Sequence, residues 1–234
     1  MNFIDGLVGD GWAYGAILPY GLVLLWAVAT APWRRLIDNG RDAGLANVWF
    51  GALVVLTLIW SLKAGAKPGL NLHLLGATAL TLMFGRQLAM LGLAVVLAAV
   101  TYNASLKGVE AWQVFALNAL ALTVFPVLVT HGIQRCVERC LPAHLFVFIF
   151  VAAFFGAGAT VVATGLLTGL LHWLAGSYSA DLLFSDYLLF YILLGFAEAW
   201  LNGATITLMV VYYPRWVGSF DDRRYLWHKK EPRP

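Results

Sequence analysis

The sequence predicts an all-α integral membrane protein with seven transmembrane helices, the N-terminus outside and the C-terminus in the cytoplasm. Of its 234 residues, 61% are hydrophobic and 12% are charged, whereas a soluble domain carries about 45–50% apolar and about 25% charged residues. So few polar residues cannot cover a soluble globule, which excludes a soluble enzyme. Seven spans of about 20 residues each leave room only for short loops.

The spans follow in order as apolar runs bounded by charges or by Gly and Pro clusters. They are predicted at 12–31, 46–62, 71–84, 87–104, 111–134, 143–174 and 185–213, within one polytopic domain at 1–217 that precedes a basic cytoplasmic tail at 218–234. The length of the sixth run implies either that the helix is tilted or that one of its ends rises into the outer loop. Its Gly165 and Gly169 offer a face on which another helix can approach closely.

The third and fourth spans are separated at Gly85-Arg86. One helix over 71–104 would be about 51 Å long, well beyond a hydrocarbon core of about 30 Å. Positive charges, which accumulate in cytoplasmic loops, test the division independently. With seven crossings and the N-terminus outside, only Lys63, Lys67 and Lys107 of the 15 Lys and Arg residues fall outside. The charges therefore favour this division and this orientation.

The segment before the first span is a candidate metal-binding arm. Its three glycines between positions 6 and 11 let it fold back toward the bundle at low steric cost. A free Met1 amine and the backbone amide of Asn2 can chelate a metal, and nitrogen ligands in a plane favour Ni(II) or Cu(II). His73, at the outer entry of the third span, can complete such a site. The alternatives are a frayed tail and a hydrogen-bonded structural histidine.

Short motifs spread over nearly the whole chain resemble one family. Residues 1–6 (Met-Asn-Phe-Ile-Asp-Gly) resemble the Met-His-Ile-x-[Asp/Glu]-Gly start of the cobalt/nickel energy-coupling-factor (ECF) permeases of the CbiM/NikM type. The segment around His73 and the turn at 85–86 are similar to later parts of that family. So are residues 115–118, which resemble its Gly-x-Asn-x-x-x-Met helix, and residues 195–199, which resemble its Gly-Glu-Ala helix.

The resemblance implies a set of ligands and a set of partners. In the family the metal is held by the terminal amine, by the backbone nitrogen and imidazole of the second residue, and by a later histidine, which correspond here to Met1, Asn2 and His73. Asn2 carries a carboxamide in place of the imidazole. Either another group replaces that imidazole, with His172 on the same predicted side as a candidate, or the cargo is a different metal or not a metal. The resemblance further implies a transition-metal ion as substrate, a bacterial inner membrane, a transmembrane coupling subunit and ATPase subunits.

Other polar residues lie within predicted spans. Glu198 is near the middle of the seventh span, where an ionisable group is functional by default. Asn202 lies one turn further on, so a satisfied Glu–Asn pair that stabilises helix packing is the alternative. Asn118 lies about 10 Å below the outer end of its span and either lines a pocket or cross-links helices. With Asp5 of the arm, these residues form the predicted cavity or coupling set.

Four residues form a possible cytoplasmic metal cluster near the fifth and sixth spans: His131, Cys136, Cys140 and His144. If this region is helical, the last three share one face at four-residue spacing. Two thiolates and an imidazole suit zinc or Cu(I). Pro142 and the neighbouring charges favour an ordinary interhelical loop instead.

The sequence contains no phosphate-binding loop, no H-E-x-x-H and no G-x-S-x-G motif. We therefore expect a non-enzyme in the lipid bilayer, without a covalently bound cofactor or a nucleic-acid partner, whose uphill transport depends on energy from partner subunits. The leading hypothesis is the substrate-binding component of a transition-metal transporter. Its rivals are a stand-alone metal-handling or assembly protein, and a redox protein whose bundle histidines ligate haem.

Overall fold

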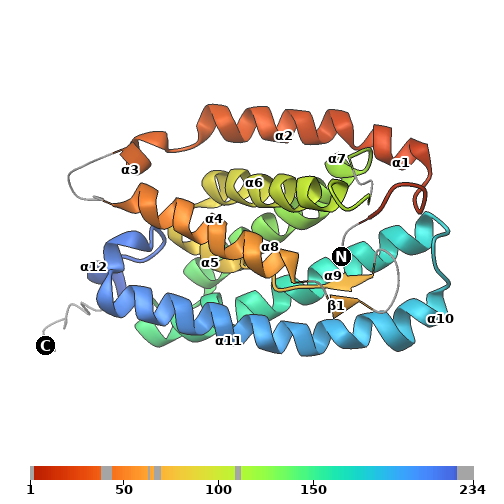
Figure 1. The fold of residues 1–234 in the computed structure, drawn as a ribbon. Helices are drawn as coiled ribbons and strands as arrows, with labels where there is room; N and C mark the ends of the chain where they lie inside the picture. The colour runs from red at the N-terminus through yellow and green to blue at the C-terminus, as the bar shows by residue number, and fades with distance from the viewer. Residues whose placement is uncertain (1–2, 38–43, 63, 66–69, 109–111, 226–234) are drawn as a thin grey trace, which may run out of the picture.

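Helices of different lengths lie roughly side by side and run between two ends of the molecule (Figure 1). The computed structural model describes residues 3–37, 44–62, 64–65, 70–108 and 112–225. One end, which we name the arm end, carries the start of the described chain and α10 (Ala180–Leu182). The opposite end, the basic end, carries α3 (Trp33–Ile37) and α12 (Asp222–Tyr225), each with two arginines.

Among the described residues, five helical stretches are long and apolar enough to cross a membrane. They are Asp10–Thr30, Arg86–Ser105, Phe115–Cys140, Val147–Leu174 and Ala180–Tyr212. A shorter apolar helix, α4 (Leu45–Ser61), lies beside α6. The chain is therefore a helical, multi-pass membrane protein. Seven crossings and the orientation of the two termini stay predictions.

Most of these stretches contain more than one element. The first joins α1 (Asp10–Gly15) to α2 (Ile17–Thr30), and the second is the single helix α6 (Arg86–Ser105). The others are α7 (Phe115–Ala119), η1 (Leu120–Val124) and α8 (Phe125–Cys140); η2 (Val147–Phe155) and α9 (Gly156–Leu174); and α10, η3 (Leu183–Tyr187) and α11 (Leu188–Tyr212). Here η1, η2 and η3 are π-helical, and a 3-10 turn, η4 (Pro214–Trp216), leads to α12.

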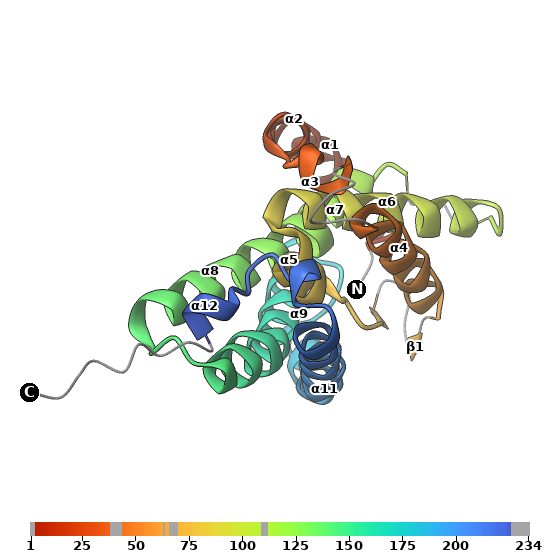
Figure 2. The ribbon, with the colours of Figure 1, turned by 90° about the vertical axis from the view of Figure 1, so that its left-hand side faces the viewer.

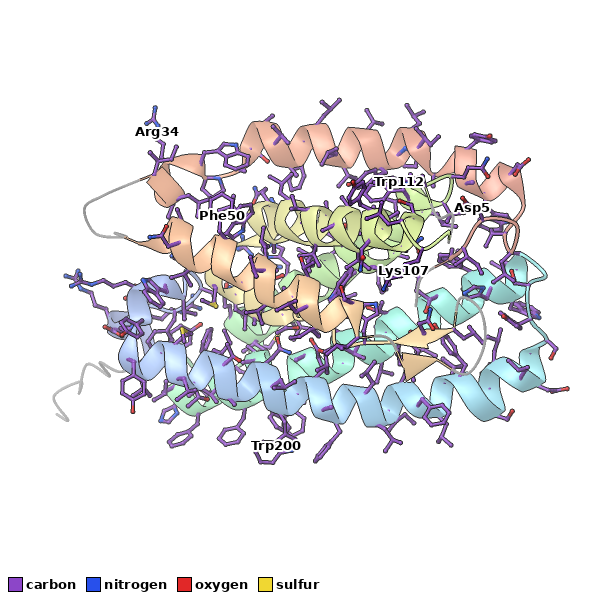
Figure 3. The ribbon with its side chains drawn as sticks, viewed as in Figure 1. Asp5, Arg34, Phe50, Lys107, Trp112 and Trp200 are labelled. Atoms are coloured by element: carbon purple, nitrogen blue, oxygen red, sulfur yellow. The ribbon has the colours of Figure 1, made fainter. Side chains whose placement is uncertain are left out.

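The outward faces of the bundle match a hydrocarbon solvent. Leu22 of α2, Phe50 of α4 and Trp200 of α11 leave about 60% of their side chains exposed, and Figure 3 shows Trp200 pointing away from the bundle. Soluble proteins rarely expose large contiguous apolar surfaces of this kind. In a bilayer the same side chains are solvated by lipid tails, so these faces agree with the multi-pass assignment.

The region predicted as the third span, 71–84, differs from a simple transmembrane helix. It begins with β2 (Asn71–Leu72), which pairs antiparallel with β1 (Ala64–Gly65), and helix α5 (Ala77–Phe84) starts only after a non-helical segment. Eight residues make a helix about 12 Å long, too short to cross the hydrocarbon core alone. The chain turns at Gly85, which has φ +83°, before α6 begins at Arg86.

Helix α5 is buried, so its free backbone groups need partners from other elements. All of its residues except Ala79 are buried. At its C-terminal end, the Met83 carbonyl accepts the Gly218 N–H at 2.9 Å, and the Leu82 carbonyl accepts the Ser219 N–H at 3.1 Å. Arg35 of α3 also donates to the Met83 carbonyl, at 3.3 Å. The segment after η4 therefore covers the end of α5.

The predicted close-approach face on α9 is confirmed. A side chain added at Gly165 would overlap the ring of Tyr191 on α11, and Gly169 lies against Tyr187 and Leu188. Tyr191 is fully buried against α9. Small residues at these two positions therefore let α9 and α11 approach closely, as in other membrane bundles.

Candidate metal centre

The N-terminal arm is held inside the bundle by Asn118 of α7. The Phe3 N–H donates to Asn118 Oδ1 at 2.7 Å, and Asn118 Nδ2 donates to the Phe3 carbonyl at 2.9 Å. Phe3 is fully buried and Asn118 is 2% exposed. A backbone clasped in this way from both sides is not a frayed tail, at least from Phe3 onward. Met1 and Asn2 lie outside the described residues.

Two more contacts fix the arm after Phe3. Asp5 Oδ1 accepts the N–H of Val114 at 3.2 Å, and Ser177 Oγ donates to the Leu7 carbonyl at 2.7 Å. Between them the backbone turns at Gly6, whose φ of +79° favours glycine. Figure 3 shows Asp5 at the arm end, opposite Arg34. The arm is thus attached both to α7 and to the loop that follows α9.

His172, in the last turn of α9, lies directly against this arm. Its ring centroid is 4.4 Å from that of Phe3 and 5.7 Å from that of Tyr178, and its side chain has no exposed surface. Within the described residues neither ring nitrogen has a hydrogen-bond partner. A buried polar group left without a partner costs about 1–3 kcal/mol. An imidazole in this state is suited to receive a ligand.

Tyr178 closes another side of His172 from the loop after α9. Burial raises the pKa of its hydroxyl above the ordinary value, so the phenol remains neutral at physiological pH. It therefore adds no negative charge beside the imidazole.

His73 lies in the non-helical segment between β2 and α5. It is 4% exposed, its ring centroid is 4.5 Å from that of Trp60 on α4, and its Nδ1 is 3.2 Å from the Leu74 carbonyl. The described residues contain no group of three His, Cys, Asp or Glu side chains that could hold a metal ion. A complete site that uses His73 and His172 therefore needs further donors.

Glu198 and Asn202 hold the backbone that follows His73. The Glu198 carboxylate accepts the N–H of Leu75 at 2.8 Å and also that of Gly76, while Asn202 Oδ1 accepts the N–H of Ala79 at 2.8 Å. Asn202 Nδ2 donates to Glu198 Oε1 at 2.9 Å. The two side chains, 1% and 3% exposed, therefore form a satisfied pair that caps the start of α5.

The same pair also borders a lateral groove. This groove has a volume of about 260 Å³ and lies between α4, α5 and α11. Apart from Glu198, Asn202 and Thr205, its lining is almost entirely apolar. The capping contacts agree with the satisfied Glu–Asn pair that the sequence offered as one interpretation. The groove agrees with the other interpretation, a functional Glu198, although the capping contacts occupy both of its oxygen atoms.

The predicted cytoplasmic cluster is not assembled as the spacing suggested. Helix α8 ends at Cys140, and the chain becomes extended around Pro142, so the helical face does not continue to His144. Instead His144 Nδ1 accepts a backbone N–H at the start of the next helix. Cys136 Sγ and Cys140 Sγ are 4.0 Å apart and exposed. No third member, including His131, completes a group able to hold a metal ion in this described region.

The sequence did not indicate Ser177 or the caps of α5. Ser177 contacts an arm residue 170 positions earlier, and Glu198 contacts backbone more than 120 positions away. The only local signal was Gly176, with φ +71°, because a glycine after a helix predicts the turn that brings the following residue back toward the bundle.

Comparison with known proteins gives one family and one fold. A family model described as "Cobalt uptake substrate-specific transmembrane region" (CbiM) matches residues 2–216. A crystal structure of a truncated transition metal transporter shares 16% identity, with a TM-score of 0.72 over 91% of this chain and 99% of that chain. A crystal structure of a transition metal transporter, also 16% identical, has a TM-score of 0.69 over 89% and 92% of the two chains. Among curated proteins, none matches significantly.

Proposed function

Because the chain belongs to the CbiM family of cobalt uptake transmembrane regions, we propose that it binds a transition-metal ion at its arm end for uptake across the bacterial inner membrane. The family match confirms the resemblance found in the short motifs of the sequence. Membership makes this chain a membrane component of metal uptake. The ion, its ligands and the partner subunits are the parts that we propose.

The observation that carries the proposal is the clasped arm beside His172. Asn118 holds the backbone of Phe3 within the bundle, and the Phe3 ring packs on an imidazole whose two nitrogens have no hydrogen-bond partner in the described structure. The described start of the arm, at Phe3, is therefore anchored next to a buried nitrogen donor. Such preorganisation matters because metal–ligand distances tolerate only about 0.2 Å of deviation.

The proposed ligands are the Met1 amine, the backbone nitrogen of Asn2, and the imidazoles of His73 and His172. All four donors are nitrogens, which suit Ni(II) and Co(II) better than Mg(II) or Ca(II). The carboxamide of Asn2 is a weaker donor than an imidazole, so His172 supplies the second imidazole. The ion is cargo here and not a resident cofactor.

Energy for uptake comes from partners in this proposal. The chain has no phosphate-binding loop, so it cannot hydrolyse ATP by that route. A transmembrane coupling subunit and ATPase subunits, as in an energy-coupling-factor transporter, would provide the work at the basic end. The arginines of α3 and α12 lie at that end, which is the cytoplasmic one by the positive-inside rule.

The test measures the metal content of the purified full-length chain by mass spectrometry, after Met1 is shown to be retained and unformylated. We expect one nickel or cobalt ion per chain. His172→Ala should reduce the affinity by at least about a hundredfold, since even the loss of an outer-shell partner costs about 10–100-fold. His144→Ala, at the other end of the bundle, is the matched control.

Other results would favour other functions. A Soret absorption band would point to haem and a redox role. Metal that is lost on Cys136→Ser but retained on His172→Ala would point to a metal-handling protein that uses the basic end. Purified chain with a confirmed free Met1 amine that binds neither Ni(II) nor Co(II) would overturn the proposed function.

A further inference from the structure

The turn that ends α9 ties the backbone of Ser177 to that of His172. Gly176 has φ +71°, and its N–H donates to the Trp173 carbonyl at 3.0 Å. The N–H of Ser177 donates to the His172 carbonyl, also at 3.0 Å. The positive φ and these two bonds form a Schellman motif, a common end of an α-helix. Ser177 is therefore fixed relative to the helical turn that carries His172.

The side chain of Ser177 bonds to the arm. At this position of a Schellman motif an apolar residue frequently packs back on the helix, whereas here a hydroxyl donates to the Leu7 carbonyl at 2.7 Å. One residue thus joins the end of α9 to the N-terminal arm, over a separation of 170 positions in the sequence. The bond is directional, since the donor and the acceptor must be aligned.

The fold of the arm carries this contact to Phe3. The Leu7 N–H donates to the Ile4 carbonyl at 3.3 Å, and the backbone turns at Gly6. Ile4 directly follows Phe3, whose ring packs on His172. A shift of Leu7 relative to α9 would therefore also shift Phe3 relative to His172.

Other hydrogen bonds that hold the arm lead to a different part of the bundle. The arm bonds to the side chain of Asn118 and to the N–H of Val114, which lie in or directly before α7. Helices α7 and α9 belong to different transmembrane stretches, and Figure 2, which looks along the bundle from the basic end, shows them on different levels. These bonds therefore place the arm relative to α7, and its position relative to α9 depends on other contacts.

Ring packing alone does not fix the arm against His172. Aromatic pairs occur over a range of centroid separations of about 4.5–7 Å. A metal–ligand distance, by contrast, tolerates only about 0.2 Å of deviation. An ion shared between the arm and His172 therefore needs a directional contact between the two, and Ser177 makes one.

We propose that Ser177 is a positioning residue of the candidate metal centre, which holds the arm in register with His172 and thereby sets how long a bound ion is retained. The inference rests on the proposed function, because it assumes that the arm and His172 bind the same ion. Ser177 is not itself a ligand in this proposal. It acts through the backbone of the arm and through the turn after α9.

The test compares substitutions at Ser177 in the purified full-length chain with a confirmed free Met1 amine. Ser177→Ala removes the hydroxyl, and Ser177→Thr retains it. Ser177→Val, which has nearly the shape of threonine without its hydroxyl, provides the comparison if the alanine variant does not fold. The matched control is Ser179→Ala, because Ser179 lies in the same loop, is exposed and makes no side-chain capping bond to α10.

Each protein is loaded with Ni(II), or with Co(II) if the parent binds only that ion, and is mixed with an excess of the chelator EDTA. We expect Ser177→Ala and Ser177→Val to release the ion about tenfold faster than the parent, the effect of one lost hydrogen bond. The rate of binding should change by less than about twofold, since substitutions at one binding site act mostly on dissociation. Ser177→Thr and Ser179→Ala should release the ion at the rate of the parent.

A double variant distinguishes positioning from general stabilisation. If Ser177 acts by placing the arm against His172, its substitution should have no further effect once that imidazole is removed. We therefore expect equilibrium dialysis to give the same affinity, within about twofold, for His172→Ala and for the double variant with Ser177→Ala. A residue that only stabilised the fold would lower the melting temperature and the amount of ion bound, without changing the release rate from folded chains.

The outcomes separate this inference from the proposed function. If the parent binds the ion and Ser177→Val releases it as slowly as Ser177→Thr, Ser177 does not position the arm, while the proposed function stands. If Ser177→Ala weakens binding equally with and without His172, the residue acts on the fold and the inference is also rejected. If the parent binds neither Ni(II) nor Co(II), both proposals fail.

Discussion

The two predicted metal clusters lie at opposite ends of the bundle and have opposite surroundings. At the arm end, His172 has no exposed surface and is enclosed by Phe3 and Tyr178. At the basic end, Cys136 and Cys140 are exposed on the last turn of α8, with their sulfur atoms 4.0 Å apart. The surroundings of His172 are therefore closed, whereas Cys136 and Cys140 are a pair of surface thiols.

The difference follows from what holds each cluster together. Cys136 and Cys140 are close because any helix brings residues i and i+4 together, which requires no tertiary structure. Phe3 and Asn118 are 115 positions apart, so their contact exists only in the folded bundle. A metal site needs several donors fixed within a fraction of an ångström. Long-range contacts such as the Asn118 clasp can provide that precision, and a solvated helix end cannot.

Moving the amine at the arm end should have the largest effect on metal binding. One residue added before Met1 displaces the amine by about 3.5 Å, far beyond the tolerance of about 0.2 Å for a metal–ligand bond. We expect nickel and cobalt binding by the purified chain to fall by more than about a hundredfold. Binding is measured by equilibrium dialysis with mass spectrometry.

The matched control adds one residue at the C-terminus, after Pro234, and should leave binding unchanged. Thermal unfolding of both extended chains should equal that of the parent. If the N-terminally extended chain binds metal as tightly as the parent, the amine is not a ligand and the arm is only a structural segment.

The next largest effect on metal binding is expected from removing the side chain of Asn118, which holds the backbone of Phe3. Asn118→Ala leaves the N–H and the carbonyl of Phe3 unpaired in a buried position, at about 1–3 kcal/mol for each group. The arm should then leave the bundle for part of the time, and a loss of about 2 kcal/mol corresponds to roughly thirtyfold weaker metal binding. Titration calorimetry with Ni(II) measures the change.

Asn103→Ala, which removes an exposed carboxamide from α6, should change neither affinity nor the melting temperature. Retained affinity in Asn118→Ala, together with a lowered melting temperature, would show that the clasp stabilises the fold without positioning a ligand.

The sequence was sufficient for features that depend on local pattern or composition. The apolar share of the chain predicted a membrane protein, Gly85 marked a break between two helices, and the spacing of Gly165 and Gly169 predicted close packing. It failed where a distant partner decides the local structure. Residues 71–76 are not helical, because Glu198 and Asn202 of α11 supply the caps that let the short helix α5 begin inside the bundle.

The candidate residues differ in the same way. Asn118 was found from its depth in a predicted span, but its partner, the backbone of Phe3, was not predictable. Cys136 and Cys140 were paired correctly by helical spacing. His144 was placed with them only if the helix continued, and the extended backbone after Cys140 ends that face.

A smaller effect is expected from adding a nitrogen donor at the arm end. Asn2→His places an imidazole where the chain has a carboxamide, and we expect nickel affinity to rise about tenfold. The same substitution should restore binding to His172→Ala, because one imidazole would then replace the other. Binding by the single and double variants is compared in one titration series. If Asn2→His does not restore binding to His172→Ala, the two imidazoles do not serve the same site.

The smallest effect is expected at the basic end, where Cys136→Ser and Cys140→Ser are combined. Both thiols are exposed and no third donor joins them in the described structure. Two exposed ligands do not define a tetrahedral site, which needs four. Nickel affinity and the melting temperature of the double variant should therefore match those of the parent within experimental error. A lower metal stoichiometry in the double variant would show that a second ion binds at this end, and the contrast between a closed site and a pair of surface thiols would no longer hold.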